Sequence, residues 1–393
     1  MAAEETNSLK ADLAERDGIE NPQKKGGLRE IALAFLRLGF VAFGGPAAHI
    51  ALMEEEFVRR RQWLSREEFV DRLGAVNLLP GPTSTEMAIY LGELRGGLPG
   101  LLTAGASFIL PAAFLTVGLA WVYVRYGSLP QLAGLLFGVK PVVVVLVAQA
   151  VWSLGKAAMK SRELAFLAAV VFVLAALGAR TLPLLIGTGV AWIAANRFGR
   201  TAGAVTPGAS ALALGGASAT TSAVFLYFLK IGALLFGSGY VLLAVLREDL
   251  VVRLHWLSET QLLDAVAVSQ ATPGPFFTVA TFVGYLLAGW RGASLGTLGM
   301  FLPAFAYVAL TANVLTRMRK SPNAGAFLDG VNAAAVALMA LVSFEFAREA
   351  VRSPLAVIIA AVAGVMVFRF RVNSAWVILG GALAGMLAKL AAS

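Results

Sequence analysis

A Pro-Gly-Pro sequence inside an apolar stretch is the part of this chain best suited to bind an anion. It consists of Pro80, Gly81 and Pro82, and the residues that follow are Thr83, Ser84 and Thr85. The prolines interrupt a helix because they lack N–H donors and move the preceding residue out of helical geometry. The helix that restarts after the break presents free N–H groups, hydroxyl donors and the positive end of its dipole. We expect these groups to hold an anion without a cationic side chain.

The same arrangement recurs later in the chain. A shift of 193 positions, from residue 80 to residue 273, places the first break on Pro273, Gly274 and Pro275. Polar groups surround this copy too: Gln270, which matches Asn77, with Thr272 and Thr278. Matched Gly/Pro-broken segments in two apolar halves are the best sequence indication of a secondary transporter whose site lies between the repeats. The alternative is that each break only kinks a helix and that its hydroxyls satisfy freed carbonyl groups.

A second pair of matched breaks lies earlier in each half. The first consists of Gly44, Gly45 and Pro46, and the second of Gly237, Ser238 and Gly239, followed by the hydroxyl of Tyr240. Small residues let another backbone approach closely, or line a narrow path with main-chain groups. These positions are therefore further candidates for substrate binding, with plain helix packing as the alternative.

Ionisable side chains inside apolar segments are a third indication of function, since each costs about 2.5–3.5 kcal/mol on insertion scales. Glu86 follows the hydroxyl cluster, and a proton on it would make protonation and anion binding favour each other. Lys140 is a countercharge for Glu86 or for the anion, or a side chain that extends to the interface. Arg37 and Lys230 match across the repeat, and they attract the anion or mark the membrane boundary. His49 is a candidate proton carrier or a structural hydrogen-bonding group.

The composition places the chain in a membrane. It is 58% hydrophobic and 14% charged, whereas a soluble domain has about 25% charged residues. With no cysteine and two histidines, we expect no metal site, and we expect no cofactor. The net charge of +9 is explained by the Lys and Arg residues of membrane loops, so we expect no nucleic-acid partner. The sequence has no G-x-S-x-G, H-E-x-x-H or Walker A motif, which argues against an enzyme.

The repeat also predicts how the chain is organised. Residues 1–27 lack the apolar core of a signal peptide and predict a flexible cytoplasmic tail, and the Gly/Ser/Thr-rich residues 201–221 predict a flexible linker. Residues 28–200 and 222–393 are the two transporter halves. We predict an all-α polytopic membrane protein with about 10–13 transmembrane or re-entrant helices. The distribution of basic residues favours opposite orientations of the halves, an inverted repeat, but it leaves the number of crossings open.

Helix starts are encoded in both halves. Trp63-Leu64-Ser65 matches Trp256-Leu257-Ser258, and each serine has Glu68 or Gln261 three residues later. This spacing is a capping box, in which the two residues satisfy each other's backbone N–H groups. It predicts that a new helix begins after each serine.

Five sequences together resemble the chromate ion transporter family in its long two-domain form: FGGPAAH at 43–49, QWLSREEF at 62–69, LPGPTSTEMAI at 79–89, FGSGYVLL at 236–243 and TPGP at 272–275. The resemblance covers nearly the whole chain after residue 28. It implies a multi-pass protein of the bacterial inner membrane that exports chromate. The implied signature positions are Gly44, Gly45, Pro46, His49, Pro80 to Glu86, Gly237, Gly239 and Pro273 to Pro275. Ser238 stands where the family pattern has a further glycine, which is a small change.

Several alternatives stay open after the resemblance. Chromate and sulfate are both tetrahedral dianions, so hydroxyls and helix N-terminal amides suit either one. A sulfate or other oxyanion carrier is the first alternative, and a channel or a membrane-embedded enzyme are others. The partners expected are the oxyanion and the lipid bilayer, and a homodimer is a candidate assembly.

Overall fold

The computed structural model describes residues 27–127, 129–198, 219–236, 239–311 and 321–391, and every regular element in these ranges is helical. This confirms the predicted all-α class. Five helices are long and apolar enough to cross a membrane: Thr83–Tyr126, Gln131–Ala158, Phe276–Thr311, Pro322–Ala350 and Ser374–Ala391. Shorter apolar helices are Thr181–Asn196, Thr221–Leu234 and Pro354–Arg369. The predicted tail and linker lie almost wholly outside the described residues, as do Gly237 and Ser238.

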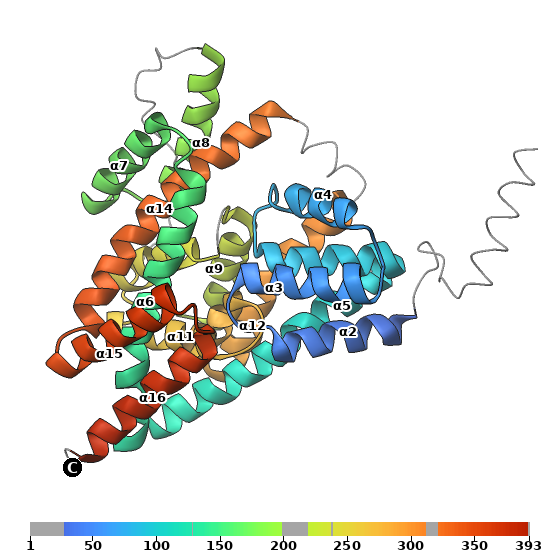
Figure 1. Ribbon diagram of the computed structural model, residues 1–393. Coiled ribbons are helices and arrows are strands. Elements are labelled where there is room, and N and C mark those ends of the chain that lie inside the picture. The colour runs from blue at the N-terminus through green and yellow to red at the C-terminus, as the bar shows by residue number, and fades with distance from the viewer. Residues whose placement is uncertain (1–26, 128, 199–218, 237–238, 312–320, 392–393) are drawn as a thin grey trace, which may run out of the picture.

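The α-helices and the first π-helix of the two halves follow the same order, and the short η3 and η4 are additional elements of the second half (Figure 1). The first half has α2 (Leu28–Val41), α3 (Pro46–Met53), the π-helix η1 (Glu54–Arg60), α4 (Arg66–Val76), α5 (Thr83–Tyr126), α6 (Pro130–Ala158), α7 (Arg162–Ala176) and α8 (Thr181–Phe198). The second has α9 (Thr221–Leu234), α10 (Val241–Leu246), the π-helix η2 (Arg247–Arg253), α11 (Glu259–Ala271), η3 (Phe276–Thr278), α12 (Val279–Thr311), α14 (Pro322–Ala350), α15 (Pro354–Gly364), η4 (Val365–Arg369) and α16 (Ser374–Ala391).

The encoded helix starts are confirmed. The Ser65 hydroxyl accepts a hydrogen bond from the Glu68 N–H at 3.1 Å, and the Glu68 carboxylate accepts one from the Ser65 N–H at 2.9 Å. Ser258 and Gln261 repeat the pair at 3.1 and 2.9 Å. Two orphan donors at the start of α4 and of α11 are thereby satisfied.

Both α5 and α12 fold back on themselves at a glycine. Gly97 and Gly289 each have φ of 59°, a left-handed conformation that favours glycine. A Cβ atom on Gly92 would lie 2.5 Å from the carbonyl oxygen of Gly100, although eight residues of straight helix span about 12 Å. A short helix after each Pro-Gly-Pro break therefore packs antiparallel against a long helix.

The last helices of each half pack against the other half. α16 packs on α6, and its counterpart α8 packs on α14. The α6–α16 crossing is close: a Cβ on Gly138 would lie 1.9 Å from the carbonyl oxygen of Gly381. Reciprocal contacts of this kind relate two units by a two-fold axis. The halves are thus interlocked around a pseudo-two-fold axis.

The equivalent helices α6 and α14 run antiparallel. The Lys160 ammonium, just after α6, lies 2.7 Å from the Asp329 carboxylate near the start of α14. One turn earlier in α6, Gly155 lies beside Val336, further along α14. Both helices are long and apolar enough to span a membrane. Equivalent spans that run in opposite directions make an inverted repeat.

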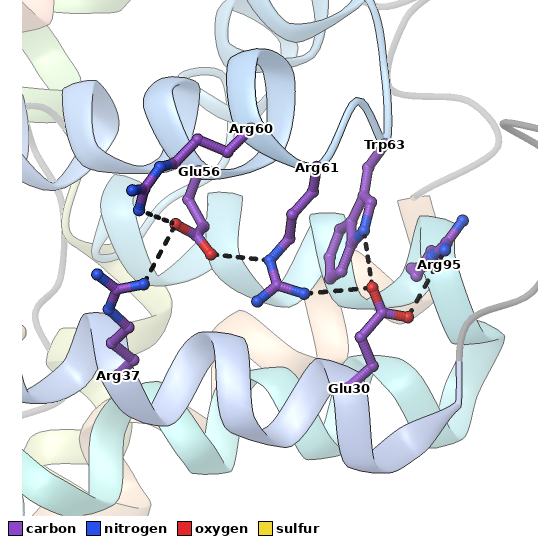
Figure 2. A network of polar contacts seen from close by, with 7 residues as sticks. All are labelled: Glu30, Arg37, Glu56, Arg60, Arg61, Trp63 and Arg95. Atoms are coloured by element: carbon purple, nitrogen blue, oxygen red, sulfur yellow. Dashed lines mark hydrogen bonds and ion pairs between the residues drawn. The ribbon is translucent and has the colours of Figure 1, made fainter. Parts of the chain in front are cut away.

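An ion-pair network surrounds the first π-helix and includes a residue that we considered for anion attraction (Figure 2). Arg37 lies 3.9 Å from the Glu56 carboxylate, and Arg61 and Arg60 approach the same group at 2.8 and 3.4 Å. Arg61 also pairs with Glu30 at 3.3 Å. The second π-helix repeats the motif, since Asp249 matches Glu56.

The repeat also places cations at matching positions in the two halves. Arg253 matches Arg60 and lies 2.8 Å from the Asp249 carboxylate. Lys230 matches Arg37, and its positive charge favours the ionised form of the same carboxyl group. Arg37 is 61% exposed and bound up in this network. This geometry favours the interpretation that Arg37 and Lys230 mark the membrane boundary over the interpretation that they attract the anion.

Packing at the α6–α16 crossing predicts a stability effect. Gly138→Ala should lower the free energy of unfolding by about 1–3 kcal/mol, because its methyl group would meet the Gly381 backbone. Thermal unfolding in detergent measures the change. Gly118→Ala is the matched control, since a Cβ there meets nothing within 4 Å. Equal stability of the two variants would contradict the crossing.

The Glu56 network predicts a pH effect. Burial alone would raise the pKa of Glu56, but the hydrogen bond and charge of Arg61, with Arg37 and Arg60, hold it below its ordinary value of 4.5. A carboxyl pKa that is lower in the folded state contributes stability above the unfolded pKa and loses it as the pH falls through the folded one. Glu56→Gln should therefore lower the melting temperature near neutral pH, and the difference from wild type should shrink below about pH 4.

The neighbouring Glu55 provides the control for this pH profile. It is 51% exposed and forms an ion pair with Arg59 at 3.4 Å. An exposed pair of this kind contributes little, so Glu55→Gln should leave the profile almost unchanged. A Glu56→Gln melting temperature that differs from wild type equally at every pH would contradict the role of ionised Glu56.

Candidate functional site

Each Pro-Gly-Pro break is bound by the earlier break of the other half. The Gly81 N–H donates to the Leu235 carbonyl at 2.8 Å, and the Gly274 N–H donates to the Ala42 carbonyl, also at 2.8 Å. The repeat relates Gly81 to Gly274 and Ala42 to Leu235, so the two hydrogen bonds are equivalent. The two Pro-Gly-Pro breaks therefore meet the ends of α2 and α9 in one region between the halves.

The glycine of each break adopts a backbone that other residues avoid. Gly81 has φ of 137° and Gly274 has φ of 92°. A Cβ on Gly274 would also lie 2.7 Å from the Cβ of Ala112. The glycines are thus required for the turn and for the close approach of the halves.

A pocket of about 710 Å³ opens beside the first Pro-Gly-Pro break. Predicted site residues that line it are Pro46, Asn77, Pro82, Thr83, Ser84 and Gly239. Phe276 and Phe277 of the second half form part of its wall, and Lys160 and Asp329 add an ion pair. The first break therefore faces open space, with hydroxyl groups at the start of α5.

An adjoining pocket of about 250 Å³ shares Pro46, Ala47 and Leu154 with the larger one. Its lining includes Gly44, Tyr240 and Gln270. Gly45 belongs to the same place, because a Cβ on it would lie 3.0 Å from the Tyr240 hydroxyl oxygen. The structure thus gathers half of the predicted substrate-binding residues around these two pockets.

The second Pro-Gly-Pro break is placed differently from the first. Pro273, Gly274 and Pro275 are buried, whereas Pro80 is half-buried and Asn77 is exposed. Thr278 donates a hydrogen bond to the Pro275 carbonyl at 2.9 Å, and Thr272 donates to the Ser269 carbonyl at 3.1 Å. These two hydroxyls satisfy carbonyl groups, which is the alternative that the sequence left open for them.

His49 connects the breaks of both halves. Its Nε2 lies 3.1 Å from the Ala42 carbonyl, which also accepts the Gly274 N–H. Because a carbonyl only accepts, Nε2 carries the proton and Nδ1 accepts from the Ser84 hydroxyl at 3.2 Å. The ring is buried, and both of its nitrogens are used. This geometry favours the structural reading of His49 over a proton carrier.

Glu86 lies directly behind the first break. Its side chain is fully buried, and neither carboxyl oxygen has a hydrogen-bond partner among the described residues. A Cβ on Gly81 would lie 2.6 Å from its Oε1. The neighbouring Thr85 hydroxyl is also buried and unpaired there. At the equivalent position of the second half, residues 278–279 are Thr and Val, so the carboxyl group is present in the first half only.

Lys140 does not pair with Glu86, which corrects one expectation. Its Nζ lies 2.9 Å from Oδ1 of Asp264 on α11, and the Tyr123 hydroxyl donates to Oδ2 at 3.0 Å. These three residues line a separate pocket of about 1070 Å³. The sequence reasoning missed Asp264 and Tyr123, although a carboxyl group within the apolar run LLDAVAV is itself a signal of function.

Comparisons with known proteins agree with this architecture. The family model described as chromate transporter matches residues 29–195 and again residues 222–386. The chromate transport protein of Cupriavidus metallidurans is 30% identical over 373 residues, which cover 92% of this chain and 93% of the relative. The chromate transport protein of Pseudomonas aeruginosa is 32% identical over 378 residues, 90% of each chain. No solved structure matches. With two family matches and relatives along most of its length, this multi-pass membrane chain belongs to the chromate transporter family.

Proposed function

We propose that this protein is a secondary transporter that exports chromate across the bacterial inner membrane. The relatives named as chromate transport proteins support the substrate. The observation that carries the site is the reciprocal pair of hydrogen bonds between the breaks, beside a pocket that Thr83 and Ser84 line. Export of a dianion from a cell that is negative inside is downhill by about 2.3 kcal/mol per charge per 100 mV.

The binding site in this proposal uses dipoles rather than a fixed cation. Thr83 and Ser84 at the N-terminus of α5 line the larger pocket, and Tyr240 and Gln270 line the adjoining one. In this proposal the N–H groups of the first turn and the Thr83 hydroxyl donate to the anion. Lys160 at the same pocket is balanced by Asp329, 2.7 Å away. A dianion held by amides and hydroxyls can leave again, which transport requires.

Sulfate is the alternative substrate, because the same groups suit both tetrahedral dianions. The bilayer is the proposed solvent for the outer faces of the helices, where large apolar side chains such as Phe114, Phe166 and Leu310 are 71–80% exposed. Such faces are also compatible with a homodimer, which stays a proposal.

Chromate uptake into inside-out vesicles tests the function. We expect saturable uptake that sulfate competes for and that an imposed potential changes. Uptake of sulfate without chromate would replace the substrate but keep the carrier. Flux without saturation would indicate a channel, and no anion flux at all would overturn the proposal.

Substitution of the proline at each break tests the site. Pro82→Ala and Pro275→Ala should each lower uptake at least about tenfold in folded protein, because a continuous helix would remove the free N–H groups. Pro354→Ala is the control, since Pro354 lies in the first turn of α15, where proline is dispensable. A wild-type rate in both break variants would show that the breaks only kink their helices.

Substitution of Glu86 tests whether it couples protons to transport. An ionised carboxylate without a partner is costly to bury, so we expect Glu86 to be neutral when buried and to exchange its proton when the site opens. Glu86→Gln should abolish the pH dependence of uptake while chromate binding persists. The exposed Glu67 gives the control variant Glu67→Gln, and an unchanged pH profile in Glu86→Gln would remove Glu86 from this role.

A further inference from the structure

The pocket of about 1070 Å³ that Lys140, Asp264 and Tyr123 line is related by the repeat to the pocket at the first break. Leu136 and Lys140 on α6 match Leu328 and Asn332 on α14, and Ala350 matches Ala158. Because the repeat is inverted, pockets related in this way open toward opposite sides of the membrane. The two pockets are therefore the two vestibules of an alternating-access protein.

The vestibules differ in charge. Lys140 is replaced by Asn332 in the other vestibule, and the repeat places Asp71 at the position of Asp264. The buried Lys140–Asp264 pair is thus present on one side only. If the pair only stabilised the packing that both halves share, we would expect it in both halves. Intramembrane ion pairs of this kind mark substrate or ion pathways by default.

The pair is built so that the lysine is the partner that can move. Asp264 is 3% exposed and its second oxygen is held by Tyr123, whereas the Lys140 side chain is 18% exposed and lines the pocket. The lysine also has a flexible stem of four carbons with three rotatable donors at its end. The ammonium group can therefore turn toward an anion in the vestibule while the Asp264 carboxylate stays in its position.

The remaining charges of the vestibule favour an anion. Glu349, Arg352 and Lys389 also line it, which makes three cationic and two anionic side chains with Lys140 and Asp264. Arg352 pairs with Glu349, so Lys389 and the Lys140–Asp264 pair together determine how much positive charge is available to a ligand. Gln261 adds the amide of a neutral side chain to the lining of the same pocket.

We propose that Lys140 is the oxyanion-binding residue of this vestibule and that Asp264 is its competing internal anion. This inference rests on the proposed transport function. A tetrahedral dianion entering the vestibule exchanges with Asp264 for the ammonium group. Asp264 lies two turns, about 10 Å, before the end of α11, and the second Pro-Gly-Pro break begins two residues after that end. A change in the partner of Asp264 can therefore reach the break through one helix.

Transport measured from each side of the membrane tests this site. Lys140→Met should raise the apparent KM for chromate about tenfold or more from one face and leave the KM from the other face unchanged, because a charged hydrogen bond to the anion is lost. Right-side-out and inside-out vesicles provide the two measurements. Asp264→Asn should lower the KM from the same face, since the internal competitor is removed.

The double variant separates binding from structure. If Asp264 acts through Lys140, then Asp264→Asn should have no effect on KM when Lys140 is already Met. Lys140→Arg should restore much of the affinity because it keeps the charge. Lys156→Met is the control on the same helix, where Lys156 contacts the Trp152 ring instead of this pocket.

A binding readout covers variants that fail to transport. Sulfate added to purified protein should raise the melting temperature of Asp264→Asn more than that of wild type, and that of Lys140→Met less. If the wild-type protein transports no anion, the proposed function is overturned. Wild-type transport with an unchanged KM from both faces in Lys140→Met, and an unchanged sulfate shift, would overturn this inference alone.

Discussion

The structure depends on how backbone groups are satisfied where helices break inside a membrane. Each unsatisfied N–H or carbonyl in lipid costs several kcal/mol, so irregular backbone is tolerated only where protein or a cavity covers it. Here the glycine N–H of each Pro-Gly-Pro break donates to a carbonyl at the earlier break of the other half. One half alone would leave both groups unpaired. Duplication and interlocking of the halves are consequences of this constraint.

A symmetric framework carries an asymmetric set of polar groups. The reciprocal hydrogen bonds, the capping boxes and the folded-back α5 and α12 occur in both halves. The buried carboxyl of Glu86 and the Lys140–Asp264 pair occur once. Backbone satisfaction requires the first group of features in both halves. The second group is free to differ, and directional transport needs such a difference between the two faces.

The charged networks at the π-helices belong to the framework. Glu56 and Asp249 occupy equivalent positions on η1 and η2. Glu56 forms ion pairs with Arg37, Arg60 and Arg61, and Asp249 forms one with Arg253. Several ion pairs that share one carboxylate hold a local geometry better than a single exposed pair does. These networks fix the elements that follow the first break of each half, and so they keep the breaks in register.

Local sequence determined the class of this protein. Apolar length, Pro-Gly-Pro breaks and Ser-x-x-Glu spacing act within one or two turns, so the helices, the two interruptions and the starts of α4 and α11 could be predicted without a fold. The internal repeat also indicated that the breaks would meet. Only the tertiary structure decided the partners. Lys140 pairs with Asp264 and not with Glu86, and Arg37 pairs with Glu56. The structure also decided that Thr83 and Ser84 after the first break line the pocket beside it. The physical reason is that a partner on another helix is chosen by helix rotation and crossing, which depend on the packing of the whole chain.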